Sequence, residues 1–367
     1  MRIAAVETKL AALPIQGGHW GDTFHRVTHI EYCFAEVTTD TGLKGLGFTH
    51  TSGVGGSTIR HLIDRELGPH VIGMEAAPRP VWHAAWHHIR DLGGGGFTTM
   101  ALAAIDIALW DLVAQEAGKP LVDHLGRVRP SIRAYASGIN LNKPLDELLD
   151  QVRNWTRKGY TAFKVKVGKP DVEEDVERLT KIREIVGSQP LMVDANQGWG
   201  IGEAVRRINA YQHLSPYWIE EPMPADDIDG HGRLRRLVRS PIGVGENVYT
   251  IQQWNQYLAR GAVDFVQADV CRVGGITPYL DIAALARAYG VPLAPHFVME
   301  LSAQLLCCLP NGHILEDVEG GSFTDLLCLA EPTPVQDGHF APAGRRPGHG
   351  ILFNDDYIRQ NAVRDAA

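Results

Sequence analysis

The sequence is poor in cysteine, and its cysteines follow no spacing typical of disulfide frameworks or metal sites. They are scattered, with no Cys-x-x-Cys pair, at Cys33, Cys271, Cys307, Cys308 and Cys328. An odd number of irregularly spaced thiols argues against a disulfide-stabilised secreted domain. We therefore expect reduced thiols, a cytoplasmic location and no cysteine ligand to a metal.

The sequence also lacks an excess of positive charge and a long uninterrupted apolar run. It has 35 Lys and Arg against 43 Asp and Glu residues, a formal net charge of −8. This balance argues against nucleic acid as the main partner and leaves small molecules open. The longest apolar run, MALAAIDIALWDLVA, is interrupted by Asp106 and Asp111, so it is too short and too charged to span a bilayer. The first residues, MRIAAVETKLAALP, contain no apolar core of a signal peptide. We expect no membrane association.

The first part of the chain has the pattern of an α+β unit. The stretch RVTHIEYCFAEVTTDTGLKGLGFTHT contains two β-rich runs around a turn signal at Asp40-Thr41-Gly42. Residues 56–125 then carry apolar positions at helical spacing, as in TTMALAAIDIALWDLVAQEAG. The glycine run at 93–96 is interpreted as a flexible loop, because no Lys-Ser/Thr follows to complete a phosphate cradle.

From residue 131 onward, short apolar runs recur, and helical patterns such as LDELLDQVRNWTRKG follow them. The expected strands are 131–137, 162–167, 190–195, 217–221, 242–246, 264–269, 291–296 and 313–316. Eight strands alternating with helices predict an α/β fold with a parallel β/α barrel. An open doubly wound sheet is the alternative, but ASGIN, after the first strand, lacks the Gly-rich turn often found there. After residue 320 the pattern breaks up into a Pro- and Gly-rich segment and a short polar tail.

The expected strands end in ionisable residues almost without exception. The second strand carries Lys164 and Lys166; the others end in Asp194 with Asn196 two positions on, Glu220 and Glu221, Glu246, Asp269, His296 and Glu316. In a barrel, catalytic groups collect at the C-terminal ends of the strands. Facing one another without compensation, these groups would destabilise the fold by several kcal/mol, so their charges must balance.

Three of these carboxylates have the spacing of a metal site. Asp194, Glu220 and Glu246 are 26 residues apart in each interval, one β/α unit each. Three oxygen donors converging from adjacent strands, with open positions left for water or substrate, suit Mg²⁺. Glu221 would point to the opposite side of its strand and is a weaker candidate.

Two lysines and an Asp–His pair are the candidate bases. Lys164 and Lys166 lie two residues apart in TAFKVKVG, so both ammonium groups share one face of the strand. Each lysine would lower the pKa of the other, and a nearby divalent cation would act in the same direction. Lys166 could therefore be neutral near pH 7 and act as a base. Asp269 and His296 lie on neighbouring strands, where the aspartate would fix the tautomer of the imidazole. His83 and His87 have an i, i+4 spacing without the glutamate of a zinc-protease motif.

The motifs together resemble the enolase superfamily and, within it, the mandelate racemase subgroup. FKVKVG resembles its Lys-x-Lys motif; VDANQGW, WIEEP and VGEN its metal ligands; QADVCRVGGIT and APHFVMELS its Asp–His dyad; and HILED its last glutamate. The resemblance implies a modified (β/α)7β TIM-type barrel at 128–322 and an α+β capping domain at 1–127. It also implies a C-terminal segment at 323–367 that returns to the cap.

The resemblance further implies roles for individual residues. One Mg²⁺ per active site would be bound by Asp194, Glu220 and Glu246. Lys166 and His296 would be the acid/base pair, with Asp269 orienting His296, and would act on the proton alpha to a carboxylate through an enediolate. Lys164 and a protonated Glu316 would contact the substrate carboxylate, near Asn196. A homo-oligomer, from dimer to octamer, is also implied.

The reaction itself is left open by these motifs. Loops near 15–30 and 48–56 would set specificity, and they offer mostly hydrogen-bonding groups: His19, Trp20, Asp22, Thr23, His25, Thr49, His50 and Thr51. These groups favour dehydration of a sugar acid (aldonate or aldarate) to a 2-keto-3-deoxy acid. Racemisation or epimerisation of a 2-hydroxy acid and cycloisomerisation of an anhydro sugar acid are the alternatives. A catalytically silent sugar-acid binder is the hypothesis outside enzymes.

Overall fold

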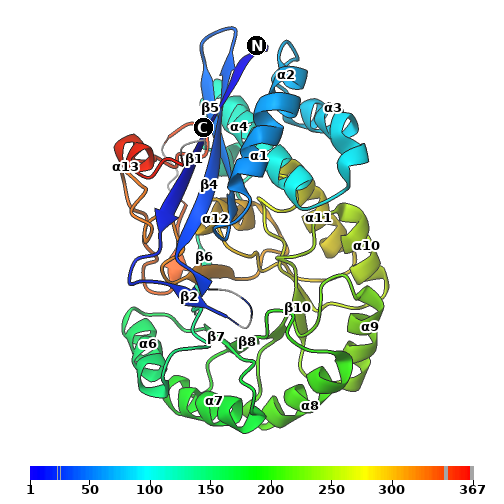
Figure 1. The fold of residues 1–367 in the computed structure, drawn as a ribbon, viewed down its shortest axis with the longest axis vertical. Coiled ribbons are helices and arrows are strands. Elements are labelled where there is room, and N and C mark those ends of the chain that lie inside the picture. Colours follow the sequence, from blue (N-terminus) through cyan, green and yellow to red (C-terminus); the bar gives the residue numbers. More distant parts are fainter. Residues whose placement is uncertain (23, 25, 343–345, 364–367) are drawn as a thin grey trace.

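The computed structural model describes residues 1–22, 24, 26–342 and 346–363. The N-terminal part is a three-stranded antiparallel sheet, in the order β1-β4-β5, with helices beside it (Figure 1). The turn predicted at Asp40-Thr41-Gly42 joins β4 to β5, as expected from its turn residues. The elements of this part are β1 (Ile3–Pro14), β2 (Trp20–Gly21), β3 (Arg26–Val27), β4 (His29–Thr39), β5 (Lys44–Thr51), α1 (Gly56–Leu62), the π-helix η1 (Ile63–Leu67), α2 (Gly68–Val71), α3 (Pro78–Ile89), the 3₁₀ turn η2 (Arg90–Leu92), α4 (Phe97–Glu116) and α5 (Leu121–His124).

Helix α4 lies directly on β5, and two glycines make this possible. A Cβ on Gly45 would stand 2.2 Å from Ala108 O, and one on Gly47 would stand 1.9 Å from Ala104 O. Helix α4 has 20 residues and is long and apolar enough, by those criteria alone, to cross a membrane. The expectation that this run is too short to span a bilayer was therefore wrong. The expectation of a core helix is confirmed, because 83% of its most apolar 18-residue window is buried.

The second part of the chain is a closed parallel barrel. Seven strands form a sheet in the order β11-β10-β9-β8-β7-β6-β12. The eighth expected strand, 291–296, forms only isolated parallel bridges, from Leu293 to Val266 and to Gly312, and these close the ring. The strands are β6 (Ile132–Ser137), β7 (Phe163–Lys166), β8 (Leu191–Asp194), β9 (Ile219–Glu220), β10 (Ile242–Val244), β11 (Phe265–Val266) and β12 (Leu315–Val318). The predicted fold class is confirmed.

Seven helices connect successive strand positions, which gives the expected (β/α)7β order within the described residues. They are α6 (Leu145–Arg157), α7 (Val172–Val186), α8 (Ile201–Tyr211) followed by the 3₁₀ turn η3 (Gln212–Leu214), α9 (Ile228–Leu237), α10 (Ile251–Ala259), α11 (Ile276–Ala288) and α12 (Met299–Cys308). Their apolar spacing explains how they pack: α6 buries Leu148, Val152 and Trp155, which recur on one face of a helix. A capping box between Thr250 and Gln253 starts α10.

The barrel interior is filled below by an apolar layer and above by polar residues. The apolar layer consists of Tyr135, Ala162, Met192, Trp218, Phe265, Ala294 and Ile314, all buried. Because alternate residues of a strand face the same side, the residue two positions later points into the barrel above each of them. Those residues are Ser137, Lys164, Asp194, Glu220, Gln267, His296 and Glu316. One rule of strand geometry therefore places most of the ionisable strand ends at one mouth of the barrel.

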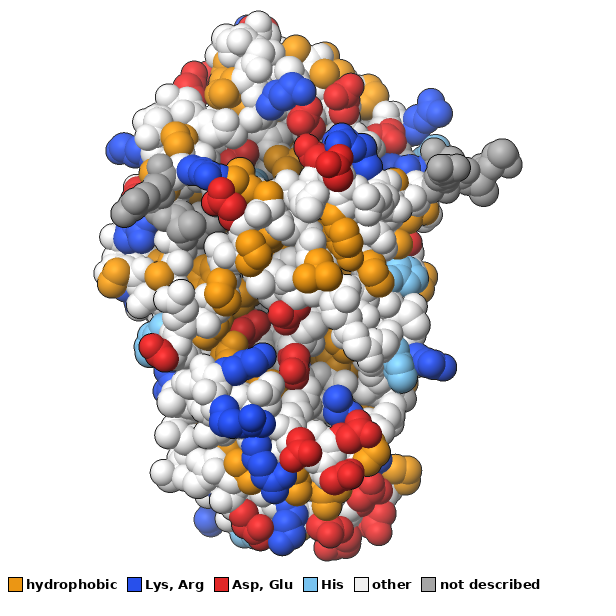
Figure 2. All heavy atoms as spheres, turned by 90° about the vertical axis from the view of Figure 1, so that its left-hand side faces the viewer, with side chains coloured by type: hydrophobic (Ala, Val, Ile, Leu, Met, Phe, Trp, Pro, Cys, Tyr) orange, Lys and Arg blue, Asp and Glu red, His pale blue; other side chains and the backbone are white. Residues whose placement is uncertain are grey.

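After β12 the chain runs back along the barrel to the N-terminal sheet. Strand β13 (His339–Phe340) pairs antiparallel with β6, and Ala362 bridges to Ala11 of β1. Helix α13 (Asp355–Gln360) lies beside β1 in Figure 1. On the face drawn in Figure 2, acidic and basic side chains are interspersed.

Candidate active site

A cavity of about 480 Å³ lies where the N-terminal sheet meets the C-terminal ends of the barrel strands. Both halves of the chain supply its wall. Among its lining residues are Trp20, Asp22, His50, Thr51, Ser52, Lys164, Lys166, Asn196, Glu246, Arg272, His296 and Glu316. The charged strand ends predicted from the sequence are thus brought to one place.

Asp194, Glu220 and Glu246 converge as the spacing predicted. One carboxylate oxygen from each lies within 4.8 Å of one from each of the other two. The residues sit on adjacent strands, with Asp194 paired to Glu220 in the register of β8 and β9. Asp194 and Glu220 are buried, at 0% and 2% exposure. Two buried oxygen donors and a third that is partly buried, on one side of an open cavity, fit a hard divalent cation with positions left for substrate oxygens, as Mg²⁺ requires.

The two lysines lie against these carboxylates. Lys164 Nζ is 2.5 Å from Glu220 Oε1 and 2.6 Å from Glu316 Oε1. Lys166 Nζ is 2.5 Å from Asp194 Oδ2. Both side chains are almost fully buried, so ion pairs must compensate their charge, and Lys164 Nζ also lies 3.6 Å from Asp194 Oδ2. The carboxylate-rich pocket expected to offset the lysine charges is therefore present.

The charge state expected of Lys166 is not found in this arrangement. Burial opposes the ammonium charge, but the contact with Asp194 outweighs it and raises the pKa of Lys166 above its ordinary value. The same balance, through Glu220 and Glu316, raises the pKa of Lys164 well above its ordinary value. The prediction of a neutral lysine considered how the second lysine and a cation would lower the pKa. It gave too little weight to direct contact with carboxylates, which raises the pKa.

The contacts of Glu316 in this arrangement favour its ionised form, although it was expected to be protonated. Burial disfavours its charge, but Lys164 and then His296 lower the pKa of its carboxyl group. Its second oxygen accepts a hydrogen bond from Phe297 N at 3.1 Å. With cationic and N–H donors on both oxygens, Glu316 acts as an acceptor here and not as a donor.

The Asp269–His296 pair forms as predicted. Asp269 Oδ2 lies 2.7 Å from His296 Nδ1, and the other ring nitrogen, Nε2, lies 3.2 Å from Glu246 Oε2. Burial opposes charge on the imidazole, but Glu246 and Asp269 together raise the pKa of His296. Burial likewise opposes charge on Asp269, but His50 and His296 lower its pKa well below the ordinary value.

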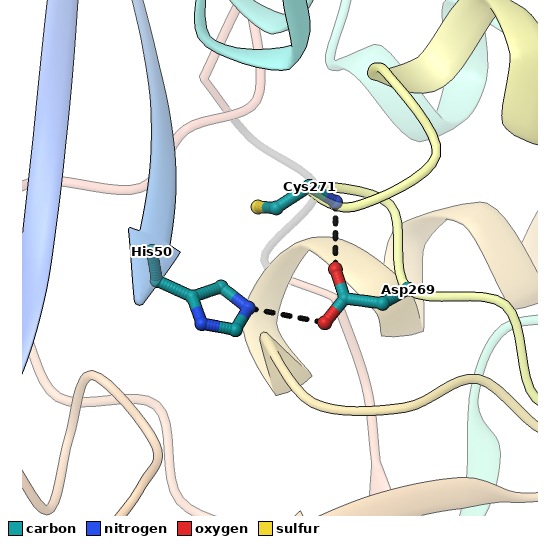
Figure 3. A group of neighbouring side chains, drawn as sticks. All are labelled: His50, Asp269 and Cys271. Atoms are coloured by element: carbon teal, nitrogen blue, oxygen red, sulfur yellow. Dashed lines mark hydrogen bonds and ion pairs between the residues drawn. The ribbon is translucent and has the colours of Figure 1, made fainter. Parts of the chain in front are cut away.

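His50 reaches the same carboxylate from the N-terminal sheet (Figure 3). Its Nε2 lies 3.0 Å from Asp269 Oδ2, across 219 positions of sequence. His50 also lines the cavity, where it was predicted to contact substrate. Its Nε2, however, already contacts Asp269 of the Asp–His pair. Cys271, drawn in the same figure, contributes its backbone N–H to Asp269 Oδ1 at 2.7 Å.

The other loop residues predicted to contact substrate divide into two groups. Trp20 lines the cavity and packs edge-on against Phe297, and Asn196 lines it while donating its N–H to Asp194 Oδ1 at 2.9 Å. His19 is instead exposed outside the lining, after a turn through Gly17 and Gly18 with positive φ. Thr49 is fully buried in β5, behind the cavity wall. His25 and Thr23 lie outside the described residues.

The upper wall of the cavity is more apolar than the loop sequence suggested. Apolar lining residues come from the N-terminal strands β2, β3 and β4, from loops of the N-terminal part, from the start of α4 and from the first barrel loop: Trp20, Phe24, Val27, Ile30, Val54, Phe97, Met100 and Ile139. Val54, at 80% exposure, and Phe97, at 47%, stand at the rim. The cavity therefore has a charged floor and a largely apolar upper wall.

Several site residues were missed in the sequence, although strand alternation could have found two of them. Gln267 lies two positions before Asp269, and its side chain donates to Glu220 Oε2 at 2.5 Å. Trp218, two before Glu220, donates its ring N–H to the same oxygen at 3.1 Å. Strand alternation does not indicate Arg272. Its Nη1 lies 3.6 Å from Glu246 Oε1 and donates to Asn247 Oδ1 at 3.0 Å.

Backbone strain is concentrated in the turns that follow these strand ends. The non-glycine residues with positive φ include Asn196 (44°), Glu221 (39°) and Val298 (45°). Such conformations cost about 1–3 kcal/mol each and persist where the surrounding structure imposes them. Each follows Asp194, Glu220 or His296 within two positions, so the strained turns fix the directions in which the site residues point.

Comparison with protein families gives two matches that together cover most of the chain. Residues 4–126 match the model described as mandelate racemase / muconate lactonizing enzyme, N-terminal domain. Residues 147–357 match the model described as enolase C-terminal domain-like. The two matched regions contain the N-terminal sheet and nearly all of the barrel.

Individual proteins are similar over the full length. A 3,6-anhydro-alpha-L-galactonate cycloisomerase of Streptomyces coelicolor is 34% identical over 363 residues, 98% of this chain and 99% of that protein. The crystal structure of a racemase from Streptomyces coelicolor with bound magnesium has a TM-score of 0.94 at 33% identity, over 98% of this chain and 100% of that one. L-Talarate dehydratase from Polaromonas sp. JS666, complexed with Mg and L-glucarate, has a TM-score of 0.91 at 33% identity, over 100% of this chain and 98% of that one.

Proposed function

The chain belongs to the mandelate racemase / muconate lactonizing enzyme family of the enolase superfamily, and on that premise we propose that it is a Mg²⁺-dependent enzyme acting on sugar acids. It removes the proton alpha to the substrate carboxylate and expels the oxygen on the β-carbon. One observation carries this proposal: Lys166 and His296 enter a single cavity from separate strand positions, above three converging carboxylates. That arrangement provides two proton-transfer groups around one bound molecule.

The roles follow from the positions of the side chains. Asp194, Glu220 and Glu246 would hold Mg²⁺, which when bound supplies positive charge against the negative charge developing on the substrate carboxylate. Lys164 stays cationic beside Glu220 and Glu316 and binds that carboxylate. One of Lys166 and His296 takes the α-proton, and the other gives a proton to the departing oxygen.

Dehydration is the form of this reaction that we favour. The α C–H bond and the β C–O bond break, a C=C bond forms, and the leaving oxygen departs as water after protonation. The resulting enol tautomerises to a 2-keto-3-deoxy acid. Polar cavity residues such as Asp22, Thr51 and Ser52 suit the hydroxyls of an aldonate or aldarate. The similar L-talarate dehydratase was crystallised with L-glucarate, an acid of this class.

Cycloisomerisation is the second candidate, and the apolar upper wall favours it. In a 3,6-anhydro sugar acid the β-oxygen belongs to a ring ether, so the same elimination opens the ring without releasing water. A compact ring presents more carbon surface than an open hydroxylated chain, which matches Val54 and Phe97 at the rim. One relative, similar over 98% of this chain, is such a cycloisomerase. Racemisation would return the proton to the opposite face and leave the β-oxygen in place.

A screen of sugar acids in D₂O with Mg²⁺ tests the proposal. Each acid is incubated with the purified chain and followed by a 2-keto-acid assay, by polarimetry and by NMR of the α-position. A 2-keto product with one solvent deuteron at C3 supports elimination. If the acid that reacts has an open chain, the reaction is dehydration; if it contains a ring ether, the reaction is cycloisomerisation. Exchange with loss of optical rotation and no keto product would identify a racemase. If acids bind but none of them exchanges its α-proton, the remaining hypothesis is the catalytically silent sugar-acid binder.

Two expectations stay predictions alongside this proposal. A homo-oligomer is expected, and light scattering after size-exclusion chromatography would measure its mass against the 40.3 kDa chain. The cytoplasmic location is expected from the cysteine pattern.

A further inference from the structure

A histidine of the N-terminal sheet enters the hydrogen-bond network of the barrel's Asp–His pair. His50 is the penultimate residue of β5, and its Nε2 lies 3.0 Å from Asp269 Oδ2. The same oxygen lies 2.7 Å from His296 Nδ1. One carboxylate oxygen therefore faces two imidazoles, one from each half of the chain (Figure 3 shows the His50 side).

The Asp269 carboxylate is held on every side. Oδ1 accepts hydrogen bonds from the backbone N–H groups of Cys271, at 2.7 Å, and Arg272, at 3.1 Å. Oδ2 has only the two imidazoles within hydrogen-bonding distance among the described residues. Without His50, Oδ2 would keep His296 as its one hydrogen-bond partner among the described residues, with Arg272 Nε 4.0 Å away, and the two N–H groups on Oδ1 would be the remaining restraints on the carboxylate.

The surroundings of His50 determine which nitrogen carries its proton. The side chain is buried at 2% exposure, against the rings of Tyr32 and Phe297. Burial lowers the pKa of His50 in spite of the neighbouring Asp269, which favours the neutral ring. A neutral imidazole has one N–H, and the carboxylate can only accept, so we assign that proton to Nε2.

The same three residues could be mistaken for a metal site. Ligand atoms of His50, Asp269 and Cys271 lie within 4.8 Å of one another. However, the Cys271 thiol donates to Phe48 O at 3.6 Å, and burial raises the pKa of this thiol well above its ordinary value. A protonated thiol is a poor metal ligand, so these three residues form a hydrogen-bond network and not a cation site.

We propose that His50 is a positioning residue for the acid/base chemistry, holding Asp269 Oδ2 toward His296 Nδ1 and so keeping Nε2 of His296 directed at the cavity. The inference rests on the proposed function for its catalytic consequence. A carboxylate fixed by donors other than the imidazole it orients is preorganised, so little rearrangement is needed when His296 gains or loses a proton. Since Thr51 and Ser52, the next residues, line the cavity, the end of β5 joins a substrate-facing loop to the catalytic pair.

Two matched substitutions separate positioning from packing. His50→Phe keeps a buried ring but removes the donor, whereas the side-chain N–H of His50→Gln can still reach Asp269. We expect His50→Phe to lower kcat about 10–100-fold with little change in KM, the range typical for partners of an active-site group. His50→Gln should recover most of that loss. Equal losses in both variants, or no loss in His50→Phe, would overturn the proposal.

An NMR measurement makes the test independent of turnover. In protein with ¹⁵N-labelled histidine, the Nδ1–H signal of His296 is assigned by its absence in His296→Asn. We expect that signal to shift in His50→Phe and to return toward wild type in His50→Gln. An unchanged signal in His50→Phe would contradict the proposal even if turnover fell. If His50→Phe does not fold, His50→Asn, whose shorter amide falls short of Asp269, replaces it.

The two measurements also distinguish this inference from the proposed function. If wild type shows no α-proton exchange with any sugar acid but the NMR shifts occur, the proposed function fails and the His50 contact stands. If exchange occurs and neither kcat nor the signal responds to His50→Phe, the function stands and the positioning role is excluded.

Discussion

Lys166 and Asp194 lie opposite each other in the register of β7 and β8, and Lys166 Nζ is 2.5 Å from Asp194 Oδ2. A candidate base and a candidate metal ligand therefore share one buried ion pair. Binding of substrate and Mg²⁺ must compete with that pair, because the lysine has to reach the α-proton and the carboxylate has to reach the cation. The first two predictions test the two members separately.

Lys166→Met should lower turnover strongly while leaving the metal site able to bind Mg²⁺. Methionine keeps much of the stem volume but cannot transfer a proton, and loss of a general acid or base costs about 10²–10⁴-fold. Isothermal titration should still detect one Mg²⁺ per chain. Lys169→Met is the matched control, since Lys169 follows the same strand but pairs with the half-exposed Glu174. A Lys166→Met enzyme with wild-type turnover would remove this lysine from the mechanism.

Asp194→Asn should weaken Mg²⁺ binding strongly, because one of three converging carboxylates loses its charge. In wild type stripped with EDTA, adding Mg²⁺ at about 100 times its Kd should stabilise the fold by about 2.7 kcal/mol, and this gain should disappear in the variant. Thermal unfolding with and without Mg²⁺ measures it. Asp317→Asn is the control, since Asp317 accepts a hydrogen bond from the Tyr160 hydroxyl and lines a different cavity. Equal Mg²⁺ stabilisation of wild type and Asp194→Asn would refute the metal assignment.

The positions of most site residues could be predicted from sequence because they depend on local geometry. Lys164, Lys166 and the strand-end carboxylates follow from short apolar runs, from the two-residue alternation of a strand and from the rule that parallel strands present their C-terminal ends together. The same alternation, applied backward from Glu220 and Asp269, also indicates Trp218 and Gln267.

What could not be predicted depends on how the two halves meet. His50 and Asp269 are 219 positions apart, and their contact exists only because β5 docks over the barrel mouth. His19 and Thr49 carry suitable side chains but face solvent or the interior, and nothing local in their sequence distinguishes them from Trp20. The charge states of Lys166 and Glu316 also depend on contacts of a few ångströms that spacing alone cannot supply.

Asp106 lies where α4 contacts α11, and its titration should make the free energy of unfolding depend on pH. Its oxygens accept hydrogen bonds from Thr277 Oγ1 at 2.6 Å and Thr277 N at 2.8 Å, yet burial raises its pKa to about 7. Because the folded pKa lies above the ordinary value of 3.8, the folded state binds the proton more tightly. This contribution to stability is complete below about pH 4 and is lost as the pH rises through about 7.

Asp106→Asn, which mimics the protonated acid, should therefore gain stability relative to wild type between pH 5 and pH 7. The difference can grow by up to about 1.4 kcal/mol per pH unit. Urea unfolding at several pH values measures it, with Asp281→Asn as control, because Asp281 is 41% exposed and pairs with Arg79 at the surface. A constant difference between Asp106→Asn and wild type across this range would contradict the raised pKa.

The apolar rim should decide which sugar acids bind well. Val54 is 80% exposed at the cavity mouth, so a substrate with a compact ring can bury it, whereas an extended hydroxylated chain gains little there. Val54→Ser should raise KM for an anhydro sugar acid about 10-fold, equivalent to about 1.4 kcal/mol, and should leave KM for an open-chain acid nearly unchanged. Leu237→Ser, an exposed apolar residue on α9 outside the cavity lining, should change neither value. If Val54→Ser raised KM equally for both acids, the rim would be a general entrance wall, and its support for a ring-bearing substrate would be lost.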